Sequence, residues 1–240
     1  MIAIIVQARM GSTRLPGKVL KKIGEKRVID HVFERLSKSK IADSVILATT
    51  VSENDNPLAE WAVKNNYPFY RGSEEDVLSR YYEAAKAHQC DIIVRVTSDC
   101  PFIDYEIVDK AIQTFVEDKK ADYVSNVHPP TYPDGMDVEV FSFASLSEAN
   151  KKASKKHQRE HVTPYIWENK DTFVLRNITC DKDHSKLRCT LDTAEDLSFL
   201  RVAYKEINNH YFLLKEFLEF VKENTHSLEL NHHLTRNSNF

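Results

Sequence analysis

Short apolar runs alternate with amphipathic helical patterns in the first half of this chain. The runs Ile2–Val6, Val45–Ala48 and Ile92–Thr97 have the length and the β-branched composition of buried strands. Between and after them, apolar side chains recur at helical spacing, as over Val77–Ala85 and Ile107–Val116. Alternation of strands and helices predicts an α/β fold with a doubly wound, mostly parallel sheet.

The second half of the chain departs from this alternation. A dense turn region, His128–Gly135, opens a stretch at about 128–180 that we expect to form a small inserted α+β segment. The later elements expected are strands at Val138–Phe141, Phe173–Ile178 and Leu187–Leu191 and helices at Ser145–Lys155, Thr193–Asn208 and Leu213–Glu223. We therefore predict a single domain over residues 1–225, including the insertion, and a polar tail at 226–240 that is frayed from Asn231 onward.

The loop after the first strand has the composition of an anion site. It contains two glycines and three cations, namely Gly11, Gly17, Arg9, Arg14 and Lys18. Glycine lets backbone N–H groups approach an anion closely, and fixed cations neutralise its charge. Five residues separate the glycines and Val19 follows Lys18, so the loop is not a Walker motif. Its position between a strand and a helix still predicts a phosphate site.

Two aspartates directly follow expected strands. Asp99 comes after Ile92–Thr97, and Asp192 comes after Leu187–Leu191. Open α/β sheets bind ligands at the carboxyl ends of their strands. Magnesium in such sites takes one or two carboxylates together with phosphate oxygens. Asp99 and Asp192 are therefore candidate magnesium ligands, and a turn or helix-cap role is the alternative for each.

The loop Ala8–Lys18 closely resembles the opening of the sugar cytidylyltransferases. These are the CMP-KDO and acylneuraminate synthetases and a branch linked to spore-coat polysaccharide, which this chain resembles most. The resemblance returns at Arg71–Arg80, Arg95–Asp104 and Leu187–Leu197 and covers about the first 210 positions. It implies the nucleotide-diphospho-sugar transferase type of fold. It also implies a magnesium-dependent reaction in which a sugar hydroxyl attacks the α-phosphorus and pyrophosphate leaves.

The resemblance also implies roles for individual residues. Arg14 and Lys18 would hold the β- and γ-phosphates, and Asp99 and Asp192 would hold magnesium. The nucleotide-binding residues implied are Ala8, Arg9, Gly11, Ser12, Arg71, Ser73, Arg80 and Ser98. The sugar-binding residues implied are Asp134, Asp137, Glu139, Glu160 and His161. Ser73 also fits a helix N-cap, and the carboxylates of the insertion could instead face solvent.

CTP and a sugar are the expected substrates. The resemblance implies a 2-keto-3-deoxy or acylneuraminate-like acid, activated for surface polysaccharide biosynthesis. Residues 97–101 read Thr-Ser-Asp-Cys-Pro where some relatives have Gln-Gly-Asp-Glu-Pro. If that glutamine helps to read the base, cytosine selectivity must come from elsewhere in this chain. In similar enzymes the insertion supplies a dimer contact, which implies a homodimer here.

Three other functions fit part of the pattern. A glycosyltransferase of the same fold would usually show a compact Asp-x-Asp, and the one Asp-x-Asp here, Asp181–Asp183, lies in a loop-like stretch. A non-catalytic nucleotide-sugar binding protein would keep the loop and lose the metal ligands, whereas both aspartates are present. The His157–His161 segment reads His-x-x-Glu-His and could bind zinc with Glu160 as a base, but no third ligand is evident.

Charge and cysteine content limit the binding partners and the cellular location that we expect. The chain has 33 basic and 36 acidic residues, a net charge of −3 and no long basic stripe, so nucleic acid is not an expected partner. Its four cysteines form no Cys-x-x-Cys motif, and no secretion signal precedes them. No apolar stretch approaches the length of a membrane span. We therefore expect a cytoplasmic protein with no membrane partner.

Overall fold

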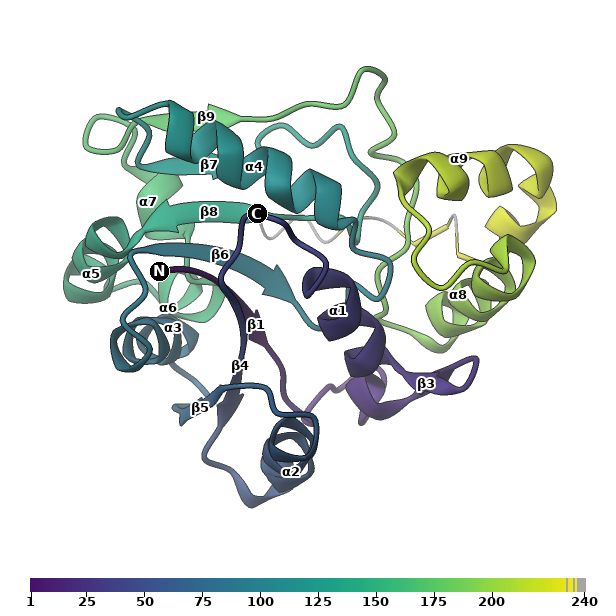
Figure 1. Ribbon diagram of the computed structural model, residues 1–240, viewed down its shortest axis with the longest axis horizontal. Coiled ribbons are helices and arrows are strands. Elements are labelled where there is room, and N and C mark those ends of the chain that lie inside the picture. Colours follow the sequence, from purple (N-terminus) through teal and green to yellow (C-terminus); the bar gives the residue numbers. More distant parts are fainter. Residues whose placement is uncertain (232, 235, 237–240) are drawn as a thin grey trace.

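A seven-stranded sheet forms the centre of the computed structural model, which describes residues 1–231, 233, 234 and 236 (Figure 1). Its strands, in chain order, are β1 (Ile2–Gln7), β4 (Ser44–Thr50), β5 (Phe69–Gly72), β6 (Ile92–Thr97), β7 (Tyr123–Ser125), β8 (Glu139–Ser142) and β9 (Leu175–Asn177). The spatial order is β5-β4-β1-β6-β8-β7-β9. Only β8 runs antiparallel to its neighbours in this sheet. The predicted mostly parallel sheet is confirmed. A separate hairpin joins β2 (Lys22–Ile23) to β3 (Lys26–Arg27).

The direction in which the sheet grows reverses at β1. The chain passes from β1 to β4 and β5 on one side and then returns to β6 on the other side. Gln7 and Thr97 are paired, so β1 and β6 end at the same level. A reversal of this kind leaves a crevice beyond the carboxyl ends of the two strands, where open α/β sheets bind ligands.

Helices cover both faces of the sheet, as the doubly wound prediction requires (Figure 1). On one side lie α1 (Val28–Leu36), α2 (Asn56–Lys64), α4 (Tyr105–Glu117), α8 (Ala194–Ile207) and α9 (Leu214–Glu223). On the other lie α3 (Val77–Ala87), α5 (Phe143–Lys152), α6 (Lys156–His161) and α7 (Pro164–Glu168). Side chains of a strand alternate between faces, so Ile4 and Val6 of β1 join the first core while Ala3 and Ile5 join the second. The described residues also form the 3-10 helices η1 (Lys18–Leu20), η2 (Glu53–Asp55) and η3 (Thr225–Leu230).

The strand predicted at Leu187–Leu191 is wrong. This segment makes a single parallel bridge, between Arg188 and Asp134. The Cys189 N–H donates to the Asp134 carbonyl at 2.7 Å, and the Leu191 N–H donates to the Asp99 carbonyl at 2.8 Å. Its side chains are buried as in a strand, but its backbone hydrogen bonds join two loops of the cavity described below and do not extend the sheet.

The predicted polar tail is anchored where the structure describes it. Helix η3 packs on α8 and α9. Asn231, where fraying was expected to begin, is only 1% exposed. Its amide donates to the Arg188 carbonyl and to Asp196, so burial of a satisfied amide fixes this position. Residues 232, 235 and 237–240 of the tail lie outside the described residues.

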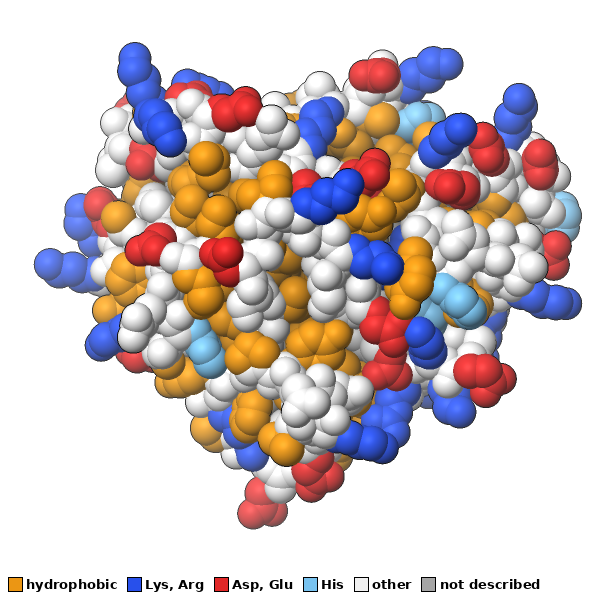
Figure 2. Space-filling model, in the orientation of Figure 1, with side chains coloured by type: hydrophobic (Ala, Val, Ile, Leu, Met, Phe, Trp, Pro, Cys, Tyr) orange, Lys and Arg blue, Asp and Glu red, His pale blue; other side chains and the backbone are white. Residues whose placement is uncertain are grey.

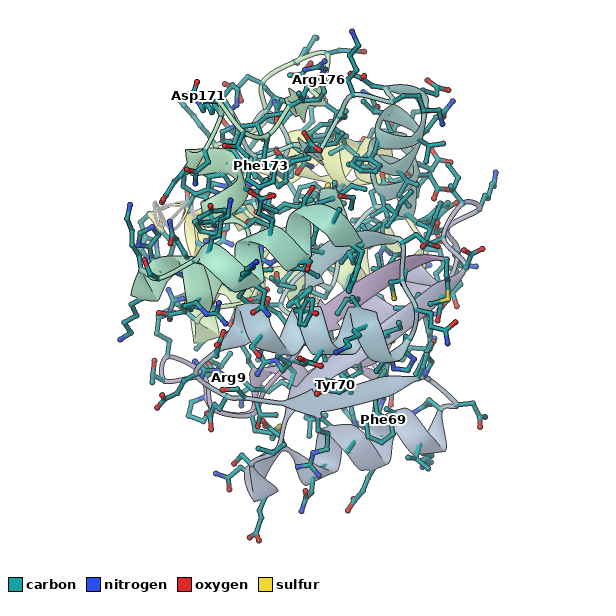
Figure 3. The ribbon with its side chains drawn as sticks, turned by 90° about the vertical axis from the view of Figure 1, so that its left-hand side faces the viewer. Arg9, Phe69, Tyr70, Asp171, Phe173 and Arg176 are labelled. Atoms are coloured by element: carbon teal, nitrogen blue, oxygen red, sulfur yellow. The ribbon has the colours of Figure 1, made fainter. Side chains whose placement is uncertain are left out.

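The surface in Figure 2 carries basic and acidic side chains interspersed over one face of the molecule. Figure 3 shows Phe69 and Tyr70 on β5 at one end of the molecule, and Asp171, Phe173 and Arg176 around β9 at the opposite end. Over the described ranges, none of the helices combines the length and the apolar content needed to cross a membrane.

Candidate active site

A cavity of about 1030 Å³ opens at the carboxyl ends of β1 and β6. Its walls come from the loops after these strands, the start of α3, helix α6 and two segments at 134–137 and 190–192. Most of the residues implicated by the sequence line it, namely Ala8, Arg9, Gly11, Ser12, Arg14, Lys18, Arg80, Ser98, Asp99, Asp134, Asp137, Glu160, His161 and Asp192. The fold therefore brings the predicted nucleotide, sugar and metal residues into one cavity.

Lys18 lies between the two predicted metal ligands. Its Nζ is 2.7 Å from Oδ2 of Asp99, 2.9 Å from Oδ1 of Asp192 and 2.8 Å from the Leu191 carbonyl oxygen. Arg14 reaches the same oxygen of Asp192 at 3.1 Å. Two carboxylates that would repel each other are thus held together by one buried ammonium group.

Burial and neighbouring charges shift the pKa values of Lys18 and Asp99 in opposite directions. Burial alone would lower the pKa of Lys18, but the charges of Asp99 and Asp192 outweigh it and raise that pKa. Burial alone would raise the pKa of Asp99, but Lys18 outweighs it and lowers that pKa. Lys18 is therefore a cation and Asp99 a carboxylate over the whole neutral range.

The oxygen atoms around Lys18 suit a hard divalent cation. Two carboxylates and a carbonyl converge on one positive centre, and oxygen ligands of this kind are those that magnesium prefers. The Lys18 ammonium group occupies the position between these oxygen atoms that a divalent cation would take. The donor set therefore fits the magnesium ion predicted for Asp99 and Asp192.

The loop after β1 is fastened at both ends, which explains how Lys18 reaches this position. The Met10 N–H donates to Asp55 at 2.6 Å, and the Gly17 N–H donates to the Met10 carbonyl at 3.2 Å. Gly17 has φ of +65°, a conformation that glycine adopts without strain, and it starts η1. The turn at Gly17 aims Lys18 across the cavity toward Asp99.

Arg188 organises the opposite wall, and the sequence analysis missed it. It is 6% exposed and makes ion pairs with Asp134 at 2.6 Å, Asp196 at 2.9 Å and Asp192 at 3.0 Å. Asp196 also closes a capping box with Thr193, which starts α8. The available signal was an arginine within an apolar run just before Asp192.

Arg236 enters the cavity from the C-terminal tail and was also missed. Its guanidinium group donates to Oδ1 of Asp137 and to the Tyr132 carbonyl at 3.4 Å, and it lies 4.0 Å from Asp134. Burial raises the pKa of Asp137 to about 7, although the charge of Arg236 opposes this. A sequence interpretation that left the tail frayed could not place a cation here.

Three of the implicated residues lie outside this cavity. Arg71 donates to the Thr50 and Ser52 carbonyls at 2.8 Å each, so it fixes the end of β4. Ser73 accepts the Asp76 N–H at 3.0 Å, in a turn that precedes α3. The N-cap of α3 is Asp76, whose side chain accepts the Ser79 N–H at 2.9 Å, so the N-cap role predicted for Ser73 is wrong.

Glu139 is the third residue outside the cavity. It is 3% exposed and forms a buried ion pair with Arg95. Its other oxygen accepts from the hydroxyls of Tyr123 at 2.5 Å and Thr163 at 2.6 Å. Burial opposes ionisation, but these partners outweigh it and lower the pKa of Glu139. Both oxygen atoms of this carboxylate are occupied, so neither is left for a sugar. The sugar contact predicted for Glu139 is therefore wrong, and the residue forms a structural ion pair instead.

The histidines of the His-x-x-Glu-His segment have separate environments. His157 contacts Glu168 at 2.6 Å on the outer side of α6, while His161 lines the cavity. Over residues 1–231, 233, 234 and 236, no group of three or more His, Cys, Asp or Glu side chains is arranged to hold a metal ion. The geometry therefore does not support the zinc alternative.

Comparison with known proteins identifies relatives that match from about half to nearly all of this chain. The family model described as cytidylyltransferase matches residues 3–234. Spore coat polysaccharide biosynthesis protein SpsF of Bacillus subtilis is 34% identical over 212 residues, covering 85% of this chain and 87% of that protein. The 3-deoxy-manno-octulosonate cytidylyltransferase of Pelobacter propionicus is 36% identical over 120 residues, covering 49% of this chain and 45% of that protein. The structure of a cytidylyltransferase from Leptospira borgpetersenii has a TM-score of 0.91 at 35% identity, covering 94% of this chain and 95% of that chain.

Proposed function

Because this chain belongs to the cytidylyltransferase family, we propose that it transfers the cytidylyl group of CTP to a sugar hydroxyl and releases pyrophosphate. The observation that carries the proposal is the convergence of Lys18, Asp99 and Asp192 in the cavity at the β1–β6 crevice. Cations for a triphosphate and carboxylates for a metal are thus combined at the ligand-binding edge of the sheet.

The residues of the first loop would bind the triphosphate. Arg14 and Lys18 would hold the β- and γ-phosphates and stabilise the charge that develops on the leaving pyrophosphate. Gly11 would offer its backbone N–H to the phosphates and Ser12 its hydroxyl, because the N–H groups of Ala8 and Ser12 already donate to the Ala48 and Met10 carbonyls. Ala8 would line the same part of the cavity. Arg9, Arg80 and Ser98 complete the wall that we assign to the base and ribose.

Magnesium is the cofactor we propose for Asp99 and Asp192. When bound, it would neutralise phosphate charge and favour ionisation of the attacking hydroxyl. The protein's own contribution is positioning and fixed charge, because phosphoryl transfers of this kind need no covalent nucleophile on the enzyme.

The sugar we propose is a 2-keto-3-deoxy or acylneuraminate-like acid, activated for surface polysaccharide biosynthesis. The names of the Pelobacter and Bacillus relatives support this choice. Asp134, Asp137, Glu160 and His161 line the part of the cavity that we assign to the sugar. A homodimer through the region 128–180 stays a prediction.

Asp99→Asn tests the proposal, with Asp91→Asn as a matched control at the other end of β6. Asp99→Asn removes a charge from the lysine–carboxylate cluster, whereas Asp91 is exposed and pairs with the N-terminal amine. We expect pyrophosphate release from CTP, magnesium and sugar to fall at least about 100-fold in Asp99→Asn. The Asp91→Asn rate should match the parent protein. A folded Asp99→Asn protein with the parent rate would remove Asp99 from the metal site.

A further inference from the structure

Asp137 lies inside the cavity and keeps an oxygen atom that no other described residue uses. The other acidic side chains inside the cavity are committed: Asp99 and Asp192 to Lys18, Asp134 to Arg188 and Asp76 to Arg159. Glu74 contacts Arg9 through Oε1 alone and is exposed. Glu75 and Glu160 are exposed at its mouth. Asp137 has a side chain that is 27% exposed, and Arg236 contacts only its Oδ1. Among the described residues, nothing hydrogen-bonds or ion-pairs with Oδ2 of Asp137.

The direction of the Asp137 side chain is fixed by its neighbours. Met136 and Val138 on either side of it are fully buried in the first core. In an extended segment successive side chains alternate in direction, so Asp137 points away from that core and lines the cavity. Gly135, with φ of +103°, sets the turn that begins this segment.

A row of alternating charges connects Asp137 to the proposed metal ligands. Arg188 spans Asp192 at 3.0 Å and Asp134 at 2.6 Å. Arg236 then spans Asp134 at 4.0 Å and Asp137. Each guanidinium group thus lies between two carboxylates. Going from Asp192 to Asp137, the row passes through Arg188, Asp134 and Arg236, and both end carboxylates line the same cavity.

We propose that Asp137 is the catalytic base of the transfer and that Arg236 is its positioning residue. The inference rests on the proposed function. In the step, the sugar hydroxyl oxygen forms a bond to the α-phosphorus, and the bond from the α-phosphorus to the bridging oxygen of pyrophosphate breaks. The electron pair of the broken bond leaves on pyrophosphate. The hydroxyl proton passes to Oδ2 of Asp137 and from there to solvent.

The charges that face Asp137 suit it to this task. Burial raises its pKa to about 7, and Asp134, Glu139 and Asp99 act in the same direction while Arg236 opposes them. A base that titrates near neutral pH is a stronger proton acceptor than an ordinary carboxylate and is still substantially ionised at that pH. Arg236 favours the ionised form of the carboxylate and leaves Oδ2 open.

The pH dependence of kcat/KM is the readout that a purely structural residue would not change. Pyrophosphate release from CTP and magnesium is measured with a set of 2-keto-3-deoxy sugar acids and neutral sugars, over about pH 5 to 9. For the parent protein we expect an acidic limb near neutrality. Asp137→Asn should lose about 100-fold or more and lose this limb, because its amide cannot accept the proton. CTP binding by calorimetry should change less than about twofold.

Arg236→Gln and Glu75→Gln complete the test. Arg236 lowers the pKa of Asp137, so Arg236→Gln should move the acidic limb to higher pH. Glu75→Gln removes one charge from the mouth of the same cavity and should leave the profile unchanged. Arg236→Gln also decides the matter if Asp137→Asn does not fold, because an unmoved limb in that variant overturns the inference.

Failure of the proposed base and failure of the proposed function give different results. Turnover by the parent protein together with an unchanged acidic limb in Asp137→Asn overturns the base and leaves the proposed function standing. A uniform loss at all pH values with the limb retained has the same meaning. No release by the parent protein with any acceptor overturns the proposed function and the base with it.

Discussion

Lys18 uses all of the hydrogen-bonding capacity of its ammonium group within the protein. An ammonium has three donors, and those of Lys18 meet Asp99, Asp192 and the Leu191 carbonyl at 2.7–2.9 Å. The same group is our candidate for the outer phosphates of CTP. Its binding to a phosphate therefore requires the exchange of at least one of these three contacts.

Replacement of Lys18 distinguishes a phosphate contact from a structural one. In Lys18→Met we expect CTP binding to weaken about tenfold or more, because a buried charge-assisted contact is worth at least about 1.4 kcal/mol. CMP lacks the outer phosphates, so its binding should change much less. Calorimetric titration of both nucleotides makes the comparison, with Lys22→Met as the control, because the Lys22 side chain on β2 is exposed. Equal losses for CTP and CMP would mean that Lys18 does not contact the outer phosphates.

The segment Leu187–Leu191 illustrates what local pattern can and cannot predict. Its alternating apolar residues correctly indicated burial, and Cys189 and Leu191 are fully buried. Periodicity does not reveal the hydrogen-bond partner of a backbone, and here the partners are the loops at Asp134 and Asp99. Asp192 nevertheless lies near Asp99, because the segment runs to the same end of the sheet that a strand would have reached.

The segment Leu187–Leu191 and the turn before Asp137 touch at Gly135. A Cβ at Gly135 would lie 2.5 Å from the Thr190 nitrogen and 2.7 Å from the Cys189 carbonyl carbon, both backbone atoms. With φ of +103° as well, Gly135→Ala should cost more than about 2 kcal/mol of unfolding free energy.

Gly11→Ala provides the matched comparison in urea unfolding. A Cβ at Gly11 would meet only Oε1 of Glu74, at an ordinary distance of 3.4 Å. We expect this variant to stay within about 1 kcal/mol of the parent protein. If the two alanine variants were equally stable, the close packing of the turn on residues 189–190 would be refuted.

At the scale of the whole molecule, the sequence predicted the fold that positions the site better than the ion pairs between its side chains. Alternating strands and helices predicted the doubly wound sheet, and the end of β6 predicted the place of Asp99. Asp192 meets it as expected, although the strand predicted before Asp192 is absent. Arg188 and Arg236 could not be predicted in the same way, because their partners are distant in the sequence and are chosen by tertiary packing. The tail shows this most clearly, since no periodic pattern marks a segment that is held by Asn231 and Arg236.

Pyrophosphate release is the measurement that tests the central claim most directly. ATP, CTP, GTP and UTP are each combined with magnesium and with the same set of 2-keto-3-deoxy sugar acids and neutral sugars. Our account predicts release that requires both CTP and one sugar acid, with a CMP-sugar as the second product. Absence of release with every pair, although the protein binds nucleotide, would contradict the account and favour a glycosyltransferase or a nucleotide-sugar binding protein.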